Sequence, residues 1–324
     1  MVDSTLTDSK ILVTGATGFI GRRLVRQLID AGAKVYAGVA PDEDPGRVAA
    51  LPAQIPQLLF DLRDAKAVRA AVAEAGPQIV VHLAAAGVTN SGVDPILALA
   101  VNAGGTLHLL EALKERAPKG GVRRIVLAGT CYEYGASQRA DESADRRSAV
   151  EGLDPFNAYA ASKVAAWAFG RMYWRAHGLP IVTVRPFQVY GPGQPARTLV
   201  PAAVRLALAG KDFSMTPGEQ ARDFVYVDDV TAGILAAIQA PGVDGLSLDL
   251  GTGRACTVRH VVERIWTLTD AAGRMLPGAL PYRPGEVMHL TADADRTARL
   301  TGWRAQMGLE QGLRHTIEQM RVDG

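Results

Sequence analysis

A tyrosine and a lysine four residues apart have the types and spacing that suit acid–base chemistry. Tyr159 and Lys163 lie in the segment Tyr-Ala-Ala-Ser-Lys, and in a helix this spacing places both side chains on one face. A tyrosine with an ordinary pKa near ~10 is a poor base at neutral pH. A nearby ammonium group favours the phenolate, so the pair suits a proton shuttle beside a hydride acceptor. An exposed helix pair without function is the alternative interpretation.

Three glycines near the N-terminus have the spacing of a dinucleotide site. Gly15, Gly18 and Gly21 follow a short apolar run and precede a helical pattern. The first glycine would make the tight turn, the second would let the backbone approach a pyrophosphate, and the third would let helix and strand pack closely. Backbone N–H groups at the helix start, including those of Phe19 and Ile20, would hold the phosphates. The pattern predicts binding of NAD or NADP.

The choice between NAD and NADP depends on the end of the second strand. An acid there would bind the ribose 2′-hydroxyl, but the position nearest the usual spacing is Val39, and Asp42 lies beyond a proline. Arg22, Arg23 and Arg47 are available to face a 2′-phosphate, although each is equally explained as surface charge. The sequence therefore leaves both cofactors open and favours NADP.

Short apolar runs that alternate with helical patterns must position these residues. Strands without polar alternation, separated by helices, indicate a parallel sheet covered on both faces. We therefore expect an α/β fold, a Rossmann-type doubly wound parallel sheet with a smaller C-terminal substrate lobe. The expected strands are Ile11–Val13, Lys34–Val39, Gln78–Leu83, Arg124–Ala128 and Leu179–Val184, and the expected helices are Gly21–Ala31, Lys66–Ala75, 95–117 and 157–177.

The second half of the chain is richer in proline and glycine clusters. Two strand-like pieces in it, Phe224–Val227 and Leu246–Leu250, are candidates to rejoin the main sheet. We expect residues 1–186, with about 223–253, to form the dinucleotide-binding domain. Residues 187–222 and 254–324 would form the substrate-binding lobe.

The composition excludes several classes of function. The chain has 324 residues, 48% of them hydrophobic, and a net charge of +2, which gives no general attraction to nucleic acid or membranes. No apolar run reaches 18 residues, and the N-terminal sequence lacks the pattern of a secretion signal. The two cysteines favour a reducing compartment, so a cytoplasmic location is expected. Scattered histidines and the absence of paired cysteines predict no metal site.

Further motifs occur in a consistent order along the chain. These are Asp61-Leu62, His82-Leu83-Ala84-Ala85, Thr130, Arg185-Pro186-Phe187 and the segment 222–229. Together with the glycines and the Tyr159/Lys163 pair, they resemble the extended short-chain dehydrogenase/reductase family, in its NAD-dependent epimerase/dehydratase group, which acts on nucleotide sugars. The resemblance extends from about residue 10 to 303.

The resemblance implies a role for each matching residue. Tyr159 would be the general acid/base, Thr130 would hydrogen-bond the reacting sugar oxygen, and Lys163 would hold the nicotinamide ribose and tune the tyrosine. For Leu83, Ala84 and Phe187, plain core packing is an equal alternative. In full, the cofactor-binding residues that the resemblance implies are Gly15, Gly18, Phe19, Ile20, Gly21, Asp61, Leu62, Leu83, Ala84, Ala85, Asn102, Tyr159, Lys163 and Phe187.

On the substrate side, the resemblance implies that Arg222 and Arg283 clamp the diphosphate, which suits planar bidentate guanidinium groups. Gln188 stands where the family usually has asparagine, which puts that substrate contact in doubt. Directly after Thr130, dehydratases of the family carry Asp-Glu, whereas this chain has Cys131 and Tyr132. Dehydration therefore lacks an evident acid and base.

Two reactions remain, and the Thr130/Tyr159/Lys163 set serves both. The Thr-x-Tyr sequence and the missing acid at Val39 favour reduction of a 4-keto (deoxy)sugar nucleotide by NAD(P)H. A nucleotide-sugar 4-epimerase is the alternative, and a non-catalytic dinucleotide-binding sensor is a more remote one. Family members commonly dimerise through the two helices expected here at 95–117 and 157–177, so the resemblance also implies a homodimer.

Overall fold

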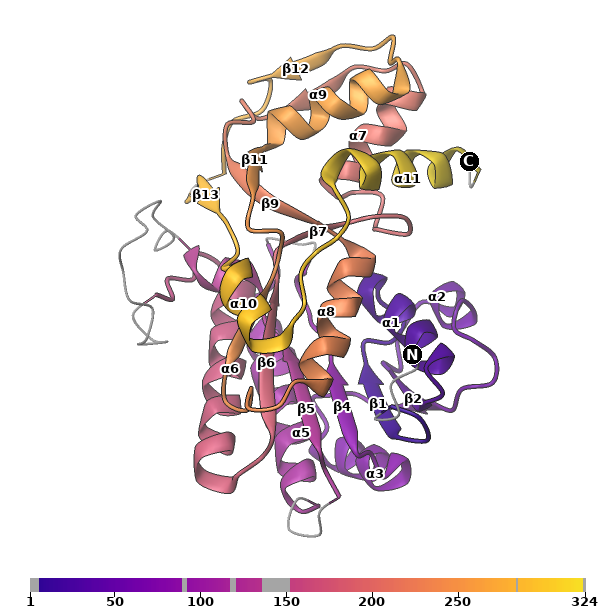
Figure 1. Ribbon diagram of the computed structural model, residues 1–324, viewed down its shortest axis with the longest axis vertical. Helices are drawn as coiled ribbons and strands as arrows, with labels where there is room; N and C mark the ends of the chain where they lie inside the picture. Colours follow the sequence, from indigo (N-terminus) through magenta and orange to yellow (C-terminus); the bar gives the residue numbers. More distant parts are fainter. Residues whose placement is uncertain (1–5, 89–91, 117–120, 136–151, 284, 323–324) are drawn as a thin grey trace.

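Seven parallel strands form the central sheet of the computed structural model (Figure 1). The structure describes residues 6–88, 92–116, 121–135, 152–283 and 285–322. The strands are β1 (Lys10–Thr14), β2 (Lys34–Val39), β3 (Gln57–Leu59), β4 (Ile79–His82), β5 (Arg124–Ala128), β6 (Ile181–Pro186) and β10 (Ser247–Leu250). Their spatial order is β3-β2-β1-β4-β5-β6-β10. The order reverses beside β1, and ligands of such sheets bind at the carboxyl ends of the strands there.

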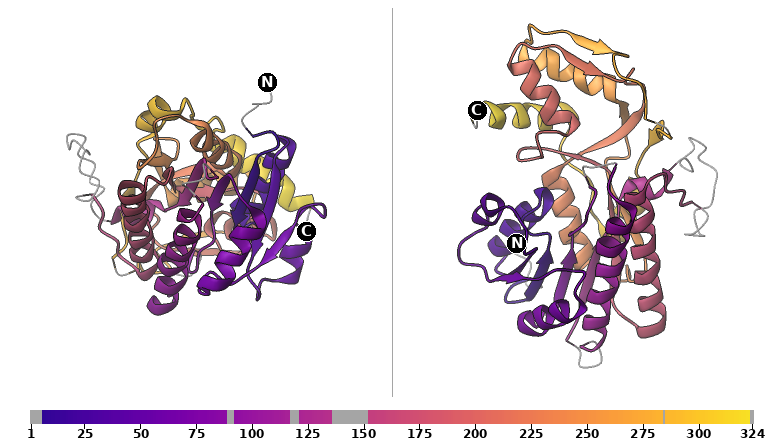
Figure 2. Two further views of the ribbon diagram at one scale, coloured as in Figure 1. Left: turned by 90° about the horizontal axis from the view of Figure 1, so that it is seen from below. Right: turned by 180° about the vertical axis from the view of Figure 1, so that it is seen from behind.

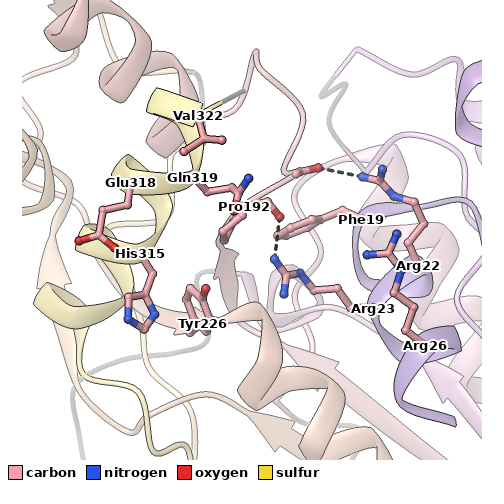
Figure 3. A pocket seen from close by; sticks show the side chains of 11 residues that line it. Phe19, Arg22, Arg23, Arg26, Pro192, Tyr226, His315, Glu318, Gln319 and Val322 are labelled. Carbon is pink, nitrogen blue, oxygen red and sulfur yellow. Dashed lines mark hydrogen bonds between the residues drawn. The ribbon is translucent and has the colours of Figure 1, made fainter. Parts of the chain in front are cut away.

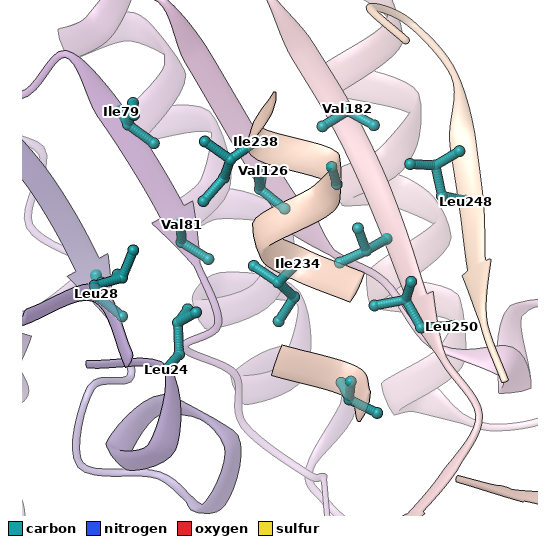
Figure 4. Close-up of a cluster of buried hydrophobic side chains, with 14 of the residues drawn as sticks. Leu24, Leu28, Ile79, Val81, Val126, Val182, Ile234, Ile238, Leu248 and Leu250 are labelled. Carbon is teal, nitrogen blue, oxygen red and sulfur yellow. The ribbon is translucent and has the colours of Figure 1, made fainter. Parts of the chain in front are cut away.

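Helices cover both faces of this sheet, as the uninterrupted apolar strands require. On one face, Ile234 and Ile238 lie over Val126 and Val182 of the central strands (Figure 4). The other face packs against a second apolar cluster that includes Leu109 and Leu113. The first face carries α1 (Phe19–Asp30) and α8 (Val227–Gln239), and the second carries α3 (Ala65–Ala75), α5 (Gly105–Lys114) and α6 (Ala158–His177). The doubly wound α/β fold expected from the sequence is confirmed.

The helix expected at 95–117 is built from three pieces. It begins as α4 (Pro95–Ala98), continues as a π-helix over Leu99–Gly104 and ends as α5. The segment Pro95–Lys114 is long and apolar enough, by length and composition, to cross a membrane, but half of its most apolar window is buried within the fold. Packing on the central sheet accounts for the buried part, which includes Leu109 and Leu113.

A second unit stands on the carboxyl ends of the sheet strands, as the view from behind shows (Figure 2). Its central strand is β9 (Ala221–Tyr226), which pairs with β7 (Gln188–Tyr190), β11 (Ala255–Thr257) and β13 (His289–Leu290). A separate pair joins β8 (Phe213–Met215) to β12 (Met275–Pro277). The covering helices are α7 (Leu199–Leu208), α9 (Val258–Thr269) and α11 (Leu309–Val322).

The two strand-like pieces of the second half have different fates. Leu246–Leu250 supplies β10, which joins the main sheet beside β6. Phe224–Val227 does not return to that sheet, because residues 221–226 form β9 at the centre of the second one. Residues 223–226 therefore lie with the substrate-side sheet, and the chain re-enters the main unit at α8. Conversely, α10 (Ala294–Thr301) packs against β10 and α8 of the main unit.

Candidate active site

Two of the three glycines, Gly15 and Gly21, lie where only glycine fits. Gly15 has a φ of +67°, and a Cβ there would lie 2.7 Å from the backbone nitrogen of Ala84. A Cβ on Gly21 would lie 2.1 Å from the carbonyl oxygen of Gly15. Since real Cβ atoms do not approach backbone so closely, a larger residue at Gly15 would push the glycine loop away from the loop after β4, and one at Gly21 would push α1 away from the glycine loop. The tight turn and close helix–strand packing expected of a dinucleotide loop are both present.

The first turn of α1 is arranged to receive a phosphate. Gly18 is the N-cap residue and offers no side-chain acceptor, so the N–H groups of Phe19 and Ile20 keep their donors at the helix start. Such donors, with the helix dipole, attract anions. The loop after β4 lies beside this turn, and its residues Leu83, Ala84 and Ala85 are half-buried. These residues fit the pyrophosphate end of a nicotinamide dinucleotide.

Glu43 lies at the glycine loop, which the sequence interpretation missed. The hydroxyl of Thr17 donates to its carboxylate at 2.5 Å, and the Asp44 N–H donates to the other carboxylate oxygen at 3.0 Å. The loop after β2 therefore turns back and brings the carboxylate of Glu43, rather than Val39 or Asp42, to Thr17 of the glycine loop. The available signal was the spacing, since Glu43 stands 22 residues after Gly21, close to the usual distance of a ribose-binding acid.

Thr130, Tyr159 and Lys163 come together at the carboxyl end of β5. All three side chains are buried. Thr130 follows β5 and caps the 3₁₀ turn Cys131–Glu133, while Tyr159 and Lys163 lie in the first turns of α6. The Lys163 ammonium donates to the Ala128 carbonyl at 2.8 Å. The triad expected from the sequence is thus assembled at one point.

Burial controls the protonation states in this triad. Burial raises the pKa of Tyr159, the negative charge of Glu133 raises it further, and a hydrogen bond with Thr130 opposes both effects. Burial lowers the pKa of Lys163 to about 8, against the attraction of Glu133. Tyr159 therefore stays protonated at neutral pH and is available as a proton donor.

A buried ion pair between Glu133 and Arg185 supports the backbone of Thr130. The sequence interpretation missed this pair as well. The carboxylate of Glu133 accepts from the Thr130 N–H at 2.8 Å and from Arg185 Nε at 2.7 Å. Arg185 also lies 5.0 Å from the ring centroid of Tyr134, whose hydroxyl donates to Asp249 at 2.7 Å. These contacts fix the backbone of the catalytic turn against β6 and β10.

Asn102 acts through its neighbours. Its side-chain oxygen accepts from the Ala86 N–H at 2.8 Å, and its amide donates to the Ala86 carbonyl at 3.0 Å and to Ser162 at 2.9 Å. The hydroxyl of Ser162 in turn donates to the Tyr159 carbonyl at 2.8 Å. Asn102 thus joins the loop after β4 to the helix that carries Tyr159 and Lys163.

The remaining cofactor-side candidates differ in what they contact. Asp61 is held by Arg63, which donates from Nε at 3.0 Å and lowers the carboxyl pKa. Leu62 is buried beneath α5, where its backbone oxygen accepts from His108. Phe187 is buried in the apolar core of the sheet, so its packing alone accounts for it.

The substrate-side candidates lie on the opposite side of Thr130. Gln188 accepts from the Tyr132 hydroxyl at 3.2 Å. Arg222 is buried next to Tyr132 and donates to Glu286 at 2.6 Å. Arg283 is exposed in the loop that leads to Glu286. The structure therefore groups Gln188 and Arg222 and leaves Arg283 at the surface nearby.

Comparison with known proteins agrees with this arrangement. Residues 11–250 match the NAD dependent epimerase/dehydratase family. The chain is 29% identical to a UDP-glucose 4-epimerase of Azospirillum brasilense over 100% of this chain and 98% of that protein. It is 30% identical to a dTDP-glucose 4,6-dehydratase of Shigella flexneri, over 95% and 92% of the two chains.

A solved structure shows the same fold. The UDP-glucose 4-epimerase of Thermus thermophilus in complex with NAD superposes with a TM-score of 0.83, at 29% identity, over 96% of this chain and 98% of that one. The family match covers most of the chain, and the fold and glycine loop agree with it. The chain belongs to the NAD-dependent epimerase/dehydratase family of nucleotide-sugar enzymes, within the extended short-chain dehydrogenases/reductases.

Proposed function

We propose that this enzyme reduces the 4-keto group of a nucleotide-activated (deoxy)sugar, with Tyr159 as the general acid. The observation that carries the proposal is the position of Tyr132. Its hydroxyl is bonded to Gln188, and its ring stands edge-on to Phe156 with centroids 5.6 Å apart. A large ring is thereby fixed two residues from Thr130.

That fixed ring matters because the two candidate reactions need different space. A 4-epimerase must let the keto sugar turn over so that both faces of C4 meet the nicotinamide. A reductase needs only one orientation of its substrate, and a rigid wall that holds one orientation favours the productive geometry. The fixed Tyr132 therefore supports reduction.

Dehydration is disfavoured by the same turn. Burial raises the pKa of Cys131 to about 12 and that of Tyr132 to about 12. Both side chains are therefore uncharged at neutral pH, and neither has the acidity of the carboxyl pair that a 4,6-dehydratase places there. Elimination of water, as in a 4,6-dehydratase, therefore has no acid and base at these two positions.

The residues of the site then have the following proposed roles. Nicotinamide dinucleotide supplies the hydride when bound. Thr130 donates a hydrogen bond to the C4 oxygen, and Tyr159 gives it a proton as C4 is reduced. Lys163 stabilises the resulting phenolate and binds the nicotinamide ribose. Arg222, with Arg283, binds the diphosphate of the substrate.

We propose NAD(H) as the cofactor. The preference for NADP rested on the lack of an acid after β2, whereas Glu43 lies against the glycine loop at Thr17. A carboxylate there accepts from ribose hydroxyls and repels a 2′-phosphate. The Thermus thermophilus epimerase, which contains NAD, supports the same choice.

A 4-epimerase is the second candidate, because several relatives of similar identity carry that activity in their names. One experiment separates the two. With a nucleotide 4-keto-6-deoxysugar, the reductase consumes one reduced cofactor per product, seen as loss of absorbance of the reduced ring. Conversion of a plain nucleotide hexose to its 4-epimer without net cofactor consumption would instead establish the epimerase. A panel of UDP, dTDP, GDP and CDP sugars identifies the nucleotide.

We also propose that the enzyme is a cytoplasmic homodimer. Apolar side chains are exposed on the two helices named above: Ile96 is 72% exposed, Leu99 53% and Met172 41%. Trp167, on the same helix as Met172, is buried and donates to Ser247 at 3.0 Å. The contact would therefore use the exposed side of α6 together with α4 and the first residue of the π-helix that follows it.

A further inference from the structure

A cavity of about 630 Å³ lies between the first helix of the sheet unit and the last helix of the chain (Figure 3). Its α1 side carries Phe19, Arg22, Arg23 and Arg26, and its opposite side includes Tyr226 and His315. Phe19 also lies at the glycine loop, and Arg22 and Arg23 are the residues that the sequence offered to a 2′-phosphate; with NAD as the cofactor, no role in the active site is assigned to these two arginines. A cavity of this volume is in the range of small-molecule sites.

The positive charge in this cavity is only partly neutralised. Arg23 is paired with Asp228 at 2.6 Å. Arg22 donates to the Gly193 carbonyl at 3.1 Å, while its Nε is buried without a partner. Arg26 is exposed and has no hydrogen bond or ion pair within the described part of the chain. Arg22 and Arg26 are one helical turn apart, so their guanidinium groups lie on the same face of α1.

The Arg22 guanidinium group lies among other positive charges that disfavour its charged form. Burial lowers the pKa of Arg22, and the positive charges of Arg26, Arg47 and Arg23 lower it further. Arginine is suited to phosphate because its planar donors bind two oxygens at once. A phosphate between Arg22 and Arg26 would offset this mutual repulsion.

The wall facing the arginines is aromatic. The rings of Tyr226 and His315 meet edge to face with centroids 6.3 Å apart, and Figure 3 shows them across the cavity from the arginines. Glu318 and Gln319 lie beside them on α11, where they can accept from hydroxyl or amino groups. Tyr226 is buried and His315 is exposed, so the imidazole is the ring open to an aromatic base, and stacking of a base on an aromatic side chain contributes to binding.

We propose that this cavity binds a nucleoside phosphate, separately from the cofactor and the sugar nucleotide. Its phosphates would lie between Arg22 and Arg26, and its base against His315. Such a ligand would contact both the sheet unit, through α1, and the substrate-side unit, through α11. Occupancy would therefore favour one arrangement of the two units.

Calorimetry on the full-length enzyme tests the proposal, with the cofactor site saturated by NAD and with ADP and pyrophosphate as probes. We expect ADP to bind the saturated enzyme, and to bind more tightly than pyrophosphate. Arg26→Ala should weaken ADP binding by about tenfold or more, the usual effect of losing a charged hydrogen bond. Arg299→Ala, an exposed arginine on α10, is the matched control and should change nothing.

Two further variants locate the probe. His315→Ala should weaken ADP and leave pyrophosphate unchanged, because only the base contacts that ring. Arg222→Ala should leave ADP unchanged, which separates this cavity from the substrate diphosphate site. Displacement of ADP by NAD, loss of ADP binding in Arg222→Ala, or equal binding to Arg26→Ala and wild type would overturn the proposal. Equal affinity for ADP and pyrophosphate would overturn its nucleoside part.

Discussion

The hydroxyl of Thr17 donates to the carboxylate of Glu43 at 2.5 Å, across 26 residues of chain. This contact ties the loop after β2 to the glycine loop and keeps the Glu43 side chain only 20% exposed. In the proposed binding mode, Glu43 faces the ribose at which NAD and NADP differ. The identity of the cofactor is therefore open to a direct test.

Replacing Glu43 should change the cofactor preference. Glu43→Ala is expected to weaken NADH binding by roughly tenfold, because charged hydrogen bonds to the ribose are lost. NADPH binding should improve, since repulsion of the 2′-phosphate is removed. Fluorescence titration of both reduced cofactors measures the two dissociation constants. If the ratio of the NADH and NADPH dissociation constants is unchanged in Glu43→Ala, with the fold intact, Glu43 does not contact the ribose.

Tyr159→Phe removes the phenolic proton and keeps the ring. Turnover should fall by about 10²–10⁴-fold, the usual contribution of a general acid, and NADH affinity should stay near the wild-type value. Steady-state kinetics and cofactor titration on the same preparation provide both numbers. A turnover within a fewfold of wild type would exclude Tyr159 as the acid.

Arg222→Ala should weaken nucleotide-sugar binding by about 1.5–3 kcal/mol, because a charged partner of the diphosphate is lost. Glu286→Gln is its control, since this change breaks the ion pair with Arg222 and keeps the guanidinium group. Arg283→Ala should have an effect in the same range. Dinucleotide binding should be spared in all three variants, and calorimetry measures both ligands. Wild-type substrate affinity in Arg222→Ala and Arg283→Ala would remove both from the substrate site.

Acid should destabilise the fold through His82. This side chain is buried between Thr14, at 2.6 Å, and Thr106, at 3.0 Å, and burial lowers its pKa to about 3. In the unfolded chain its pKa is near 6.5, so only the unfolded state binds this proton between those values. The free energy of unfolding should therefore fall as pH drops from 6.5 towards 3, by at most about 1.4 kcal/mol per pH unit from this group.

Urea unfolding at several pH values measures that slope. His82→Gln keeps hydrogen-bonding groups but does not titrate. Its free energy of unfolding should therefore depend less on pH in this range, by up to about 1.4 kcal/mol per pH unit, which is the effect of one proton. Identical slopes in the two proteins would mean that His82 is protonated equally in the folded and unfolded states.

The expected homodimer has its own test. Light scattering at micromolar concentration should give twice the chain mass of 34.3 kDa. Met172→Glu, which places a charge on the exposed edge of α6, should shift the protein to the monomer. The matched surface variant Leu208→Glu, on α7, should remain dimeric. A wild-type mass near 34.3 kDa would contradict the dimer.

The sequence predicts those parts of the fold that depend on local patterns. The run Lys34–Val39 is β2 residue for residue, because a buried parallel strand needs a continuous apolar run bounded by turn residues. The helix before Gly178 ends where expected, with that glycine in the left-handed region. Tyr159 and Lys163 are found because their spacing of four is a local helical pattern, whereas Thr130 is found through the resemblance to the family.

The parts that were missed depend on the path of the chain. Glu43 reaches Thr17 only because the loop after β2 reverses. Glu133 meets Arg185 only because β5 and β6 are neighbours in the sheet. The sheet to which residues 224–226 belong is likewise decided by distant partners, and an apolar strand pattern does not contain that information.

The π-helix at Leu99–Gly104 acts as a change of phase within one long helix. Its wider turn accommodates one more residue than an α-helical turn would, so the sides before and after it face different directions. Ile96, before the π-helix, and Leu99, its first residue, are exposed; after it, Leu109 and Leu113 are fully buried. The same turn directs Asn102 to Ala86 and Ser162. Deleting a single residue here would therefore swing Asn102 away by about 100°, the rotation per residue of a helix with 3.6 residues per turn.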